Sequence, residues 1–411
     1  METSTFSIHS AIALEDQYGA HNYHPMPVVL TKGQGVYVWD TEGKKYFDFL
    51  SAYSAVNQGH CHPRIVDALT KQARALTLCS RAFYNDKLGL AEKFVCELFG
   101  YEKSLFMNSG AEANETAIKL ARKWGYTKKG IPADEAIIVA VKKNFHGRTT
   151  TIISASTDPS ASSGFGPLMP GFKIVDYDNV SQLEESLADP RVCGLWIEPI
   201  QGEAGVYVPS EGYLKQAEQI CRNNNVLLMM DEIQTGIGRT GKMLASDHEG
   251  VRPDLLILGK ALSGGTMPVS CVLADDEVML VIKPGEHGST FGGNPMAAVV
   301  TVEALKVILE EGLIEHAANQ GTLFRSRMHE LSRKTDLIKE VRGKGLLNAI
   351  VINDSPDSQT AWDLCIELMK NGLLAKPTHG NIIRLAPPLV ITKEEMDQSC
   401  SIIEKCVLAF R

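Results

Sequence analysis

Short apolar runs alternate with segments of helical spacing from residue 63 onward, and this alternation constrains the fold more than any other feature. Runs that are apolar throughout are typical of parallel strands buried on both faces, and such strands need crossover helices between them. The pattern therefore predicts an α/β domain with a mainly parallel sheet flanked by helices. The apolar runs span residues 136–141, 194–197, 226–230 and 255–258, and the helical segments span residues 65–75, 87–98 and 112–124.

The chain has 411 residues, a length that suits two or three domains. We expect a large domain over residues 63–312, which ends in a long helix-like stretch after Pro295. The mixed pattern of residues 313–411 predicts a smaller α+β domain. Residues 1–62 are rich in turn-forming residues and short alternating segments, which predicts an antiparallel element that packs beside the smaller domain.

Composition and charge exclude several classes of protein. Hydrophobic residues make up 44% of the chain and charged residues 22%, which excludes disordered and fibrous proteins. The apolar runs have the length of strands and fall well short of the roughly 18 residues that a membrane span needs. The net charge of −8, without a long basic cluster, argues against nucleic acid and a membrane surface as partners.

The nine cysteines bear on the compartment. Their number is odd and no C-x-x-C pair is present, so we expect reduced thiols rather than a disulfide framework. The first twenty residues lack an apolar signal core and an Arg-rich amphipathic pattern. We therefore expect a cytoplasmic protein, with a mitochondrial-matrix protein whose transit peptide has been removed as the alternative.

Polar residues follow four apolar runs at the point where each run stops. Asp231, Lys260 and Glu198 follow three of them, and residues 108–111 (Asn-Ser-Gly-Ala) lead from the fourth into a helix. Any one of these residues alone could be a helix cap or a surface charge. Because ligands of α/β sheets collect at the carboxyl ends of strands, four such ends together predict a functional site.

Lys260 suggests the chemistry of that site. It stands between apolar residues, in Leu-Gly-Lys-Ala-Leu, where a charged ammonium group is costly to bury. Desolvation lowers the pKa of a lysine from about 10.4 and makes a nucleophilic amine available. Pyridoxal phosphate requires such a lysine, an acidic partner for its ring nitrogen, and a phosphate cradle at a helix N-terminus. Lys260, Asp231 and residues 109–111 match these three requirements.

The chain also resembles a known family. Residues 228–241 (Leu-Met-Met-Asp-Glu-Ile-Gln-Thr-Gly-Ile-Gly-Arg-Thr-Gly) and 258–265 (Leu-Gly-Lys-Ala-Leu-Ser-Gly-Gly) resemble the signature of the class III aminotransferases. The resemblance implies the fold-type-I architecture of transferases that use pyridoxal phosphate, and a homodimer with active sites at the interface. Further matches lie at residues 59–63, 108–112, 145–148, 198–203 and 290–295.

The resemblance implies which residues hold the cofactor. Lys260 is expected to bind pyridoxal phosphate covalently and to move protons, and Asp231 to pair with the ring nitrogen. Phe145 would stack on the ring, and Thr290 would reach the phosphate bound by the neighbouring subunit. The other cofactor contacts that it implies are Ser109, Gly110, Ala111, His146, Glu198 and Gln234.

Within the family, three segments resemble the branch that takes L-ornithine as amino donor and 2-oxoglutarate as acceptor. Other branches, which use N-acetylornithine or 4-aminobutyrate, share most of the large-domain motifs and stay open as alternatives. The three segments are residues 19–25, 51–59 and 384–389.

The two substrates together require two carboxylate holders, one of which can be switched off. Arg148 and Arg384 are the candidates, because a guanidinium group binds a carboxylate bidentately. The resemblance implies that Glu203 pairs with Arg384 while ornithine is bound, and releases it for 2-oxoglutarate. Arg148 would then hold the α-carboxylate of ornithine, with Tyr23 on its α-amine and Tyr53 nearby.

Three other interpretations deserve weight. Residues 236–241 (Gly-Ile-Gly-Arg-Thr-Gly) match the G-x-G-x-x-G pattern of dinucleotide-binding proteins, but no long helix or well-placed acidic residue follows. His60 and His62, or His21 and His24, could suggest a metal, although no further ligand is evident. A non-catalytic scaffold would have no need of Lys260.

Overall fold

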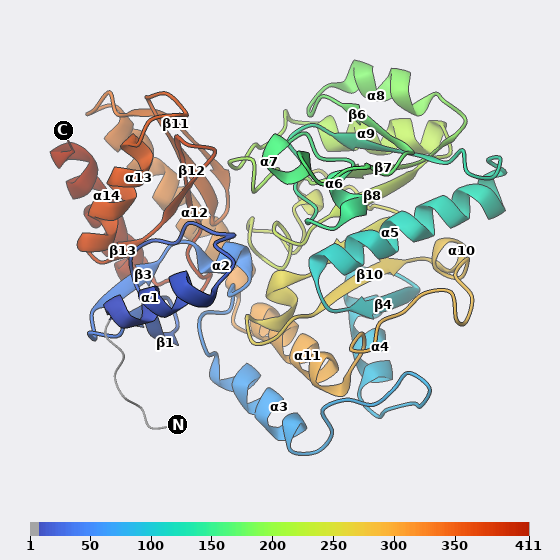
Figure 1. Ribbon diagram of the computed structural model, residues 1–411, viewed down its shortest axis with the longest axis horizontal. Coiled ribbons are helices and arrows are strands. Elements are labelled where there is room, and N and C mark those ends of the chain that lie inside the picture. The colour runs from blue at the N-terminus through green and yellow to red at the C-terminus, as the bar shows by residue number, and fades with distance from the viewer. Residues whose placement is uncertain (1–7, 411) are drawn as a thin grey trace.

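Three β-sheets organise the computed structural model, which describes residues 8–410 (Figure 1). A seven-stranded sheet occupies one half of the molecule, and two four-stranded sheets lie in the other half. The strands are β1 (Leu30–Gln34), β2 (Tyr37–Asp40), β3 (Lys45–Asp48), β4 (Lys103–Met107), β5 (Ile137–Val141), β6 (Phe172–Val175), β7 (Val192–Ile197), β8 (Leu227–Asp231), β9 (Leu255–Leu258), β10 (Ser270–Ala274), β11 (Ile338–Lys344), β12 (Leu347–Ile352), β13 (Leu373–Leu374), β14 (Lys376–Thr378) and β15 (Ile382–Leu385).

The helices connect and cover these sheets. They are α1 (Ile8–Tyr18), α2 (Ser51–Ser54), α3 (Pro63–Ala73), α4 (Leu88–Phe99), α5 (Gly110–Trp124), α6 (Thr150–Ile153), α7 (Pro159–Ser162), α8 (Val180–Leu187), α9 (Tyr213–Asn223), α10 (Asp276–Met279), α11 (Pro295–Glu310), α12 (Leu313–Ser332), α13 (Thr360–Lys370) and α14 (Lys393–Ala409). A π-helical turn η1 (Gly125–Lys129) extends α5, and η2 (Ser246–His248) and η3 (Lys260–Ser263) are short 3₁₀ segments.

The seven-stranded sheet has the order β4-β10-β9-β8-β7-β5-β6. Strands β9, β8, β7, β5 and β6 run parallel to one another, and β10 runs antiparallel to both β4 and β9. Every residue of β7, β8 and β9 is buried, as expected for strands that are covered on both faces. The α/β fold with a mainly parallel sheet flanked by helices is therefore confirmed.

Helices cover both faces of this sheet because successive side chains of a strand point to opposite sides. Ile138 and Trp196 belong to the core that α5 covers. Their chain neighbours Val139 and Leu195 belong to the opposite core, which contains residues of α8 and α9. This packing holds α5 firmly against the sheet, with its N-terminus directly after β4.

The other two sheets are built from the N-terminal and the C-terminal parts of the chain. Strands β11, β12, β15 and β14 form an antiparallel sheet in that order. Strands β1, β2 and β3 form an antiparallel meander, and β13 from the C-terminal part pairs with β3 in parallel. The domain boundaries expected after residues 62 and 312 stay a prediction, which this distribution of the sheets fits.

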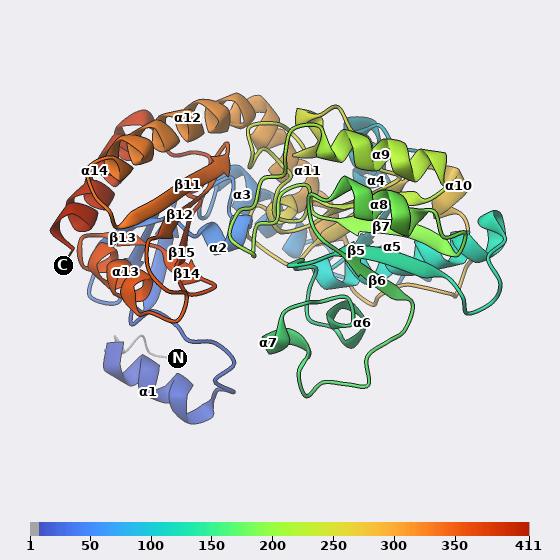
Figure 2. The ribbon, with the colours of Figure 1, turned by 90° about the horizontal axis from the view of Figure 1, so that it is seen from above.

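Helix α1 differs from the sequence-based expectation, which treated the N-terminal part as turns and short strands. It spans Ile8–Tyr18, contains no buried residue, and projects from the body of the fold (Figure 2). Periodic burial could not reveal it, since none of its faces packs into a core.

Candidate active site

The carboxyl ends of strands that run in one direction bring the expected site residues to one edge of the seven-stranded sheet. Asp231 is the last residue of β8, Glu198 follows β7, and Lys260 comes two positions after the end of β9. Phe145 follows β5, and Ser109 lies between β4 and α5. Elements that are remote in the chain therefore contribute to one site.

Asp231 is 4% exposed, and its carboxylate accepts three hydrogen bonds from the protein. Oδ2 accepts from His146 Nδ1 at 2.7 Å and from Asn114 Nδ2 at 2.9 Å. Oδ1 accepts from the backbone N–H of Ile233 at 3.0 Å. These donors hold the carboxylate in one orientation at the edge of the sheet. Because a carboxylate offers about four acceptor positions, one position is left for a further donor.

Lys260 begins η3 with a φ of +44°. This left-handed backbone is uncommon for a residue other than glycine, and such strain clusters at functional sites. The side chain is partly buried. Desolvation lowers the pKa of its amine, and the negative charge of Asp231 opposes that shift. A lowered pKa favours the neutral amine, which is the form that acts as a nucleophile.

Glu198 and Phe145 are joined directly. The backbone N–H of Phe145 donates to Glu198 Oε2 at 3.0 Å. Burial, with the nearby charge of Asp231 as a second cause, raises the pKa of Glu198 well above its ordinary value. On the outer side, the guanidinium carbon of Arg148 lies 5.7 Å from the centre of the Phe145 ring. Arg148 itself is exposed at the rim of the site.

Gln234 is buried against a glycine that makes room for it. A Cβ atom at Gly202 would lie 1.6 Å from Gln234 Oε1, so a larger residue at that position would displace the Gln234 side chain. Gln234 Nε2 donates to the carbonyl oxygen of Tyr53 at 3.4 Å. This contact links the loop after β8 to the N-terminal part of the chain.

The N-terminus of α5 faces a pocket that Lys260 also lines. The hydroxyl of Ser109 accepts from the Glu112 N–H at 3.2 Å, and the Glu112 carboxylate accepts from the Ser109 N–H at 2.9 Å. The N–H groups of Gly110 and Ala111, in the first turn, have no partner within the helix and favour an anion. The pocket that contains Ser109, Gly110 and Lys260 has a volume of about 360 Å³.

Thr290 lies outside that pocket. It is exposed, in the segment between β10 and α11. Its neighbour Ser289 accepts a hydrogen bond from Asn108 Nδ2 at 2.7 Å, which places the segment beside the chain that leads into α5. Within one chain, Thr290 is therefore near the pocket without lining it.

Arg384 and Glu203, which are 181 positions apart, form a partly buried ion pair. Arg384 Nη1 donates to Glu203 Oε2 at 2.7 Å, and Thr378 Oγ1 donates to Glu203 Oε1 at 3.3 Å. Arg384 lies on β15 and is 5% exposed, whereas the side chain of Glu203 is 33% exposed. The guanidinium group thus has one carboxylate partner that can move while the arginine stays in place.

Tyr53 completes this cluster. Its ring centre lies 4.8 Å from the guanidinium carbon of Arg384. The ring is held by α2, in which all four residues have a positive φ, so α2 is a left-handed turn. Burial raises the pKa of Tyr53, Arg384 opposes the rise, and Glu203 and Tyr23 add to it. Tyr23 is therefore close to the ring, although it is itself 74% exposed.

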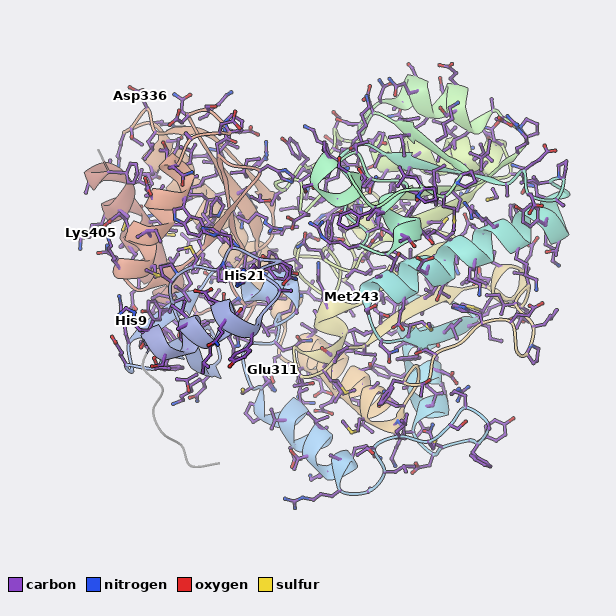
Figure 3. All side chains as sticks on the ribbon, in the orientation of Figure 1. His9, His21, Met243, Glu311, Asp336 and Lys405 are labelled. Carbon is purple, nitrogen blue, oxygen red and sulfur yellow. The ribbon has the colours of Figure 1, made fainter. Side chains whose placement is uncertain are left out.

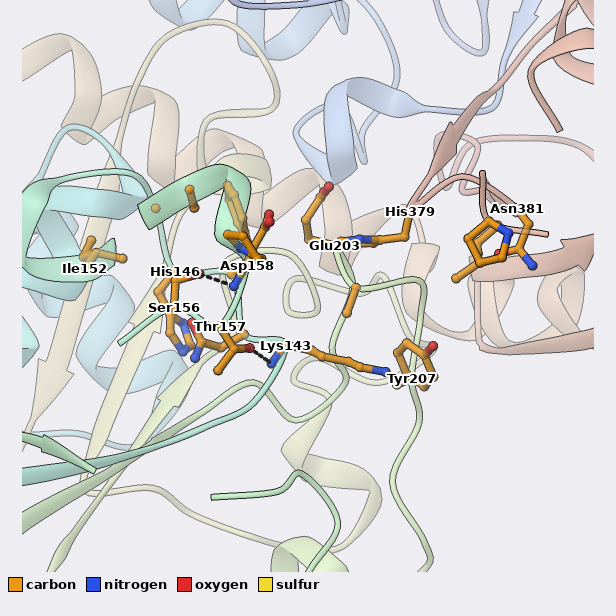
Figure 4. Close-up of a pocket in the computed structure, with 18 residues that line it drawn as sticks. Lys143, His146, Ile152, Ser156, Thr157, Asp158, Glu203, Tyr207, His379 and Asn381 are labelled. Atoms are coloured by element: carbon orange, nitrogen blue, oxygen red, sulfur yellow. Dashed lines mark hydrogen bonds between the residues drawn. The ribbon is translucent and has the colours of Figure 1, made fainter. Parts of the chain in front are cut away.

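A second cavity of about 370 Å³ lies beside Phe145 and Glu203 (Figure 4). Lys143 extends along it until its amine lies 4.9 Å from the centre of the Tyr207 ring. His379, from the C-terminal part of the chain, lines the other side. Glu203 therefore has open space on the side away from Arg384.

The histidines that could have suggested a metal have separate partners. His60 Nε2 lies 2.8 Å from Asp48 Oδ2, and His62 Nε2 lies 3.1 Å from Glu311 Oε1. Glu311 is labelled in Figure 3. Within residues 8–410, no group of three histidine, cysteine or acidic side chains is arranged to hold a metal ion. In the same part of the chain, no helix combines the length and the hydropathy needed to cross a membrane.

The glycine-rich residues 236–241 form turns rather than the start of a helix. Arg239, in their middle, is fully buried and donates to Asn57 Oδ1, the Leu346 carbonyl oxygen and the Pro387 carbonyl oxygen. This segment therefore joins three parts of the fold, which agrees with setting the dinucleotide-binding interpretation aside.

Asn114 and Trp196 belong to the site although no motif in the sequence pointed to them. Asn114 Nδ2 donates to Asp231, and its Oδ1 accepts from Trp196 Nε1 at 2.9 Å. A signal was available, because Asn114 stands among the small buried residues Ala113 and Ala117 on the inner side of α5. A polar residue on a buried helix face needs a partner.

These residues fit pyridoxal phosphate. Asp231 has one acceptor position left for the ring nitrogen, and Lys260 carries an amine whose pKa is lowered. The first turn of α5 offers N–H groups to the phosphate in the pocket that Lys260 lines. The roles of the individual side chains stay predictions, and their placement is consistent with all three parts of the cofactor.

Comparison with known proteins gives the family. The class III aminotransferase model matches residues 18–407. The mitochondrial ornithine aminotransferase of Drosophila melanogaster is 62% identical over 397 residues, which cover 97% of this chain and 91% of that protein. An ornithine aminotransferase structure from Toxoplasma gondii, with partial occupancy of pyridoxal phosphate, has a TM-score of 0.97 and 49% identity, covering 99% of this chain and 95% of that one.

A third relative is an acetylornithine aminotransferase from Elizabethkingia anophelis. Its solved structure has a TM-score of 0.92 and 60% identity, and the match covers 98% of this chain and 99% of that one. Relatives whose names give different donors thus share the fold with this protein. The chain belongs to the class III aminotransferases, whose cofactor is pyridoxal phosphate.

Proposed function

We propose that this protein transfers the δ-amino group of L-ornithine to 2-oxoglutarate, giving glutamate 5-semialdehyde and glutamate. The observation that carries the proposal is the ion pair of Arg384 with Glu203 beside Tyr53. It supplies a carboxylate holder that can be covered for one substrate and uncovered for the other. The ornithine aminotransferases among the relatives support the same donor.

The bound cofactor supplies an electron sink for the carbon that loses a proton. Lys260 takes the proton from the carbon that bears the reacting amine, and later returns a proton to the second substrate. Asp231, whose carboxylate is held by hydrogen bonds from His146, Asn114 and Ile233, would pair with the ring nitrogen. Phe145 covers the ring and limits the access of water.

Substrate orientation follows from the two arginines. Arg148, at the exposed rim, holds the α-carboxylate of ornithine, and Tyr23 contacts its α-amine. Glu203 covers Arg384 during this half of the reaction, so the δ-amine rather than the α-amine reaches Lys260. When 2-oxoglutarate binds, Glu203 moves into the cavity beside it, and Arg384 receives the α-carboxylate.

The proposal includes a homodimer. Thr290 is exposed in one chain and lies near the pocket without lining it. In a dimer, each Thr290 would donate its hydroxyl to the phosphate bound by the partner subunit. An assembly of two chains would therefore complete two sites at once.

We also propose a reducing compartment, either the cytoplasm or the mitochondrial matrix. All nine cysteines are thiols, and six of them are buried. The Drosophila relative is described as mitochondrial, which favours the matrix among the two.

N-acetylornithine is the second candidate donor, because the Elizabethkingia relative is an acetylornithine aminotransferase with 60% identity. The two candidates differ in the α-amine, which is charged in ornithine and acylated in N-acetylornithine. Tyr23 and Tyr53 line the side where this group would lie. Relative kcat/KM values for the two donors would decide between them.

The first experiment is the absorption spectrum of the purified holoenzyme before and after L-ornithine is added. We expect a visible band that shifts to the near-ultraviolet and returns when 2-oxoglutarate follows. A K260A variant should show no such cycle. A visible band that responds to N-acetylornithine and ignores ornithine would favour the second candidate, and the absence of any band after pyridoxal phosphate is supplied would contradict both.

A further inference from the structure

Asn114 is fully buried on α5, one turn after Gly110. Its amide nitrogen lies 2.9 Å from Asp231 Oδ2, 3.0 Å from the carbonyl oxygen of His146 and 3.2 Å from that of Gly110. Its amide oxygen lies 2.9 Å from Trp196 Nε1. Both polar atoms of the side chain therefore have partners, and the charged one is the carboxylate that faces the cofactor site.

Trp196 determines which way the amide of Asn114 faces. An indole N–H can only donate, so the atom next to it must be the amide oxygen. The NH₂ group must then face Asp231. A reversed amide would place an oxygen against the carboxylate and an NH₂ group against the indole N–H. Trp196 cannot turn away, because it is fully buried and stacked on His146 at 3.9 Å.

We propose that Asn114 is a positioning residue for amino transfer, which holds the carboxylate of Asp231 directed at the ring nitrogen of the cofactor. Trp196 holds the amide in its donating orientation. This inference rests on the proposed function. It adds Asn114 and Trp196 as two residues that act through Asp231.

The position of Asn114 on α5 has a second consequence. Gly110 and Ala111, which offer N–H groups to the phosphate, stand at the first turn of the same helix. A helix is rigid, so the place of the phosphate and the place of the Asp231 carboxylate are set relative to each other. Through α5, Asn114 thereby connects the phosphate end of the cofactor site with the end at which Asp231 lies.

The substitution N114D tests the donor directly. Aspartate has nearly the same shape and still accepts from Trp196, but it turns the amide donor into a second carboxylate oxygen beside Asp231. Two carboxylates at that distance cannot both stay ionised, so one binds a proton. We expect N114D to bind pyridoxal phosphate about ten- to hundredfold more weakly, and N114A about tenfold more weakly, as the loss of hydrogen bonds to a charged group predicts.

Three measurements on N114D, N114A and W196F separate positioning from packing. They are the titration of the apoprotein with pyridoxal phosphate, the pH midpoint at which the visible band of the holoenzyme changes, and kcat and KM for ornithine. We expect N114D to lose the most affinity for pyridoxal phosphate, N114A to lose less, and W196F to lose the least. The shift of the pH midpoint should be largest in N114D and smallest in W196F. In all three variants, kcat for ornithine should fall while KM changes little.

N348D is the matched control. Asn348 is a fully buried amide on β12, and its oxygen accepts from Arg325 rather than facing a carboxylate. We expect N348D to keep the cofactor affinity and the pH midpoint of the wild type. If N114D and W196F lower only the Tm and keep those two values, Asn114 is structural and the inference is wrong. Because the titration needs no amino donor, failure of the wild type to respond to ornithine would overturn the proposed function instead.

Discussion

At the scale of single residues, the two members of the Arg384–Glu203 ion pair differ in burial, and this difference suggests which of them moves. Arg384 is 5% exposed and has a tyrosine ring against its guanidinium group, so it stays in place. Glu203 is more exposed and borders a cavity of about 370 Å³. Removing one partner of a buried charge pair leaves the other without compensation. A substrate carboxylate can supply that compensation when Glu203 moves.

Glu203→Ala should therefore change which amine reacts. We expect the α-amine of glutamate to become a better donor by about tenfold, equivalent to about 1.4 kcal/mol, because Arg384 is always uncovered. The measurement is the rate of the half-reaction with glutamate relative to that with ornithine, followed by absorbance. Glu340→Ala, which removes an exposed partner of Arg342, is the control. An unchanged ratio in Glu203→Ala would contradict the switch.

At the scale of elements, α5 holds the segment that carries Thr290. Lys119 Nζ donates to the carbonyl oxygen of Glu286 at 3.1 Å and lies 3.0 Å from His287 Nδ1. His287 Nε2 lies 2.7 Å from Thr116 Oγ1, whose own proton is donated to the carbonyl oxygen of Glu112. The imidazole must therefore accept from Lys119 and donate to Thr116. Only the neutral form, protonated at Nε2, does both.

This geometry gives a pH prediction. Burial and the charge of Lys119 lower the pKa of His287, while Glu112 and Glu115 oppose the shift. As the pH falls below about 6.5, the unfolded chain binds the proton first, so the folded state loses stability. At higher pH, the imidazole is neutral in both states and makes no such difference.

We expect the Tm of the wild type to fall more between pH 7.5 and pH 5 than that of His287→Gln, which cannot take up the proton. His329→Gln, at an exposed position on α12, serves as the control and should behave like the wild type. Equal losses of Tm in His287→Gln and the wild type would contradict the assignment of the neutral form.

At the scale of the whole molecule, Arg239 joins three regions. It donates to Asn57 from the N-terminal part and to the carbonyl oxygens of Leu346 and Pro387 from the C-terminal part. Burial lowers the pKa of Arg239 to about 9, and within residues 8–410 no carboxylate forms an ion pair with it. Several acceptors from remote segments therefore depend on one buried guanidinium group.

Arg239→Met should lower the free energy of unfolding by about 3 kcal/mol, because buried acceptors that lose their donor cost about 1 to 3 kcal/mol each and the relieved burial of a charge returns part of that. Thermal and denaturant unfolding of the holoenzyme would measure the change. Arg333→Met, at an exposed position, is expected to stay within about 0.5 kcal/mol of the wild type. A similarly small change in Arg239→Met would show that the three regions hold together without it.

The parallel sheet and the strand-end residues were readable from the sequence. A strand buried on both faces has to be apolar throughout, so its end is visible wherever a charged residue interrupts the run. Asp231, Glu198 and Lys260 stand at such interruptions. The dinucleotide-binding alternative at residues 236–241 could already be set aside from the sequence, because no long helix follows the glycines, whereas the contacts that Arg239 makes there come from remote segments.

What the sequence by itself determined was the architecture and the kind of chemistry at one sheet edge, since both follow from local runs of residues and from the family signature. The tertiary structure decided the partners: Glu203 with Arg384, and Asn114 between Asp231 and Trp196. Periodicity tells which face of an element a side chain occupies, whereas a hydrogen bond depends on where another element places its acceptor to within a few tenths of an ångström. That placement exists only once the sheets and helices have packed.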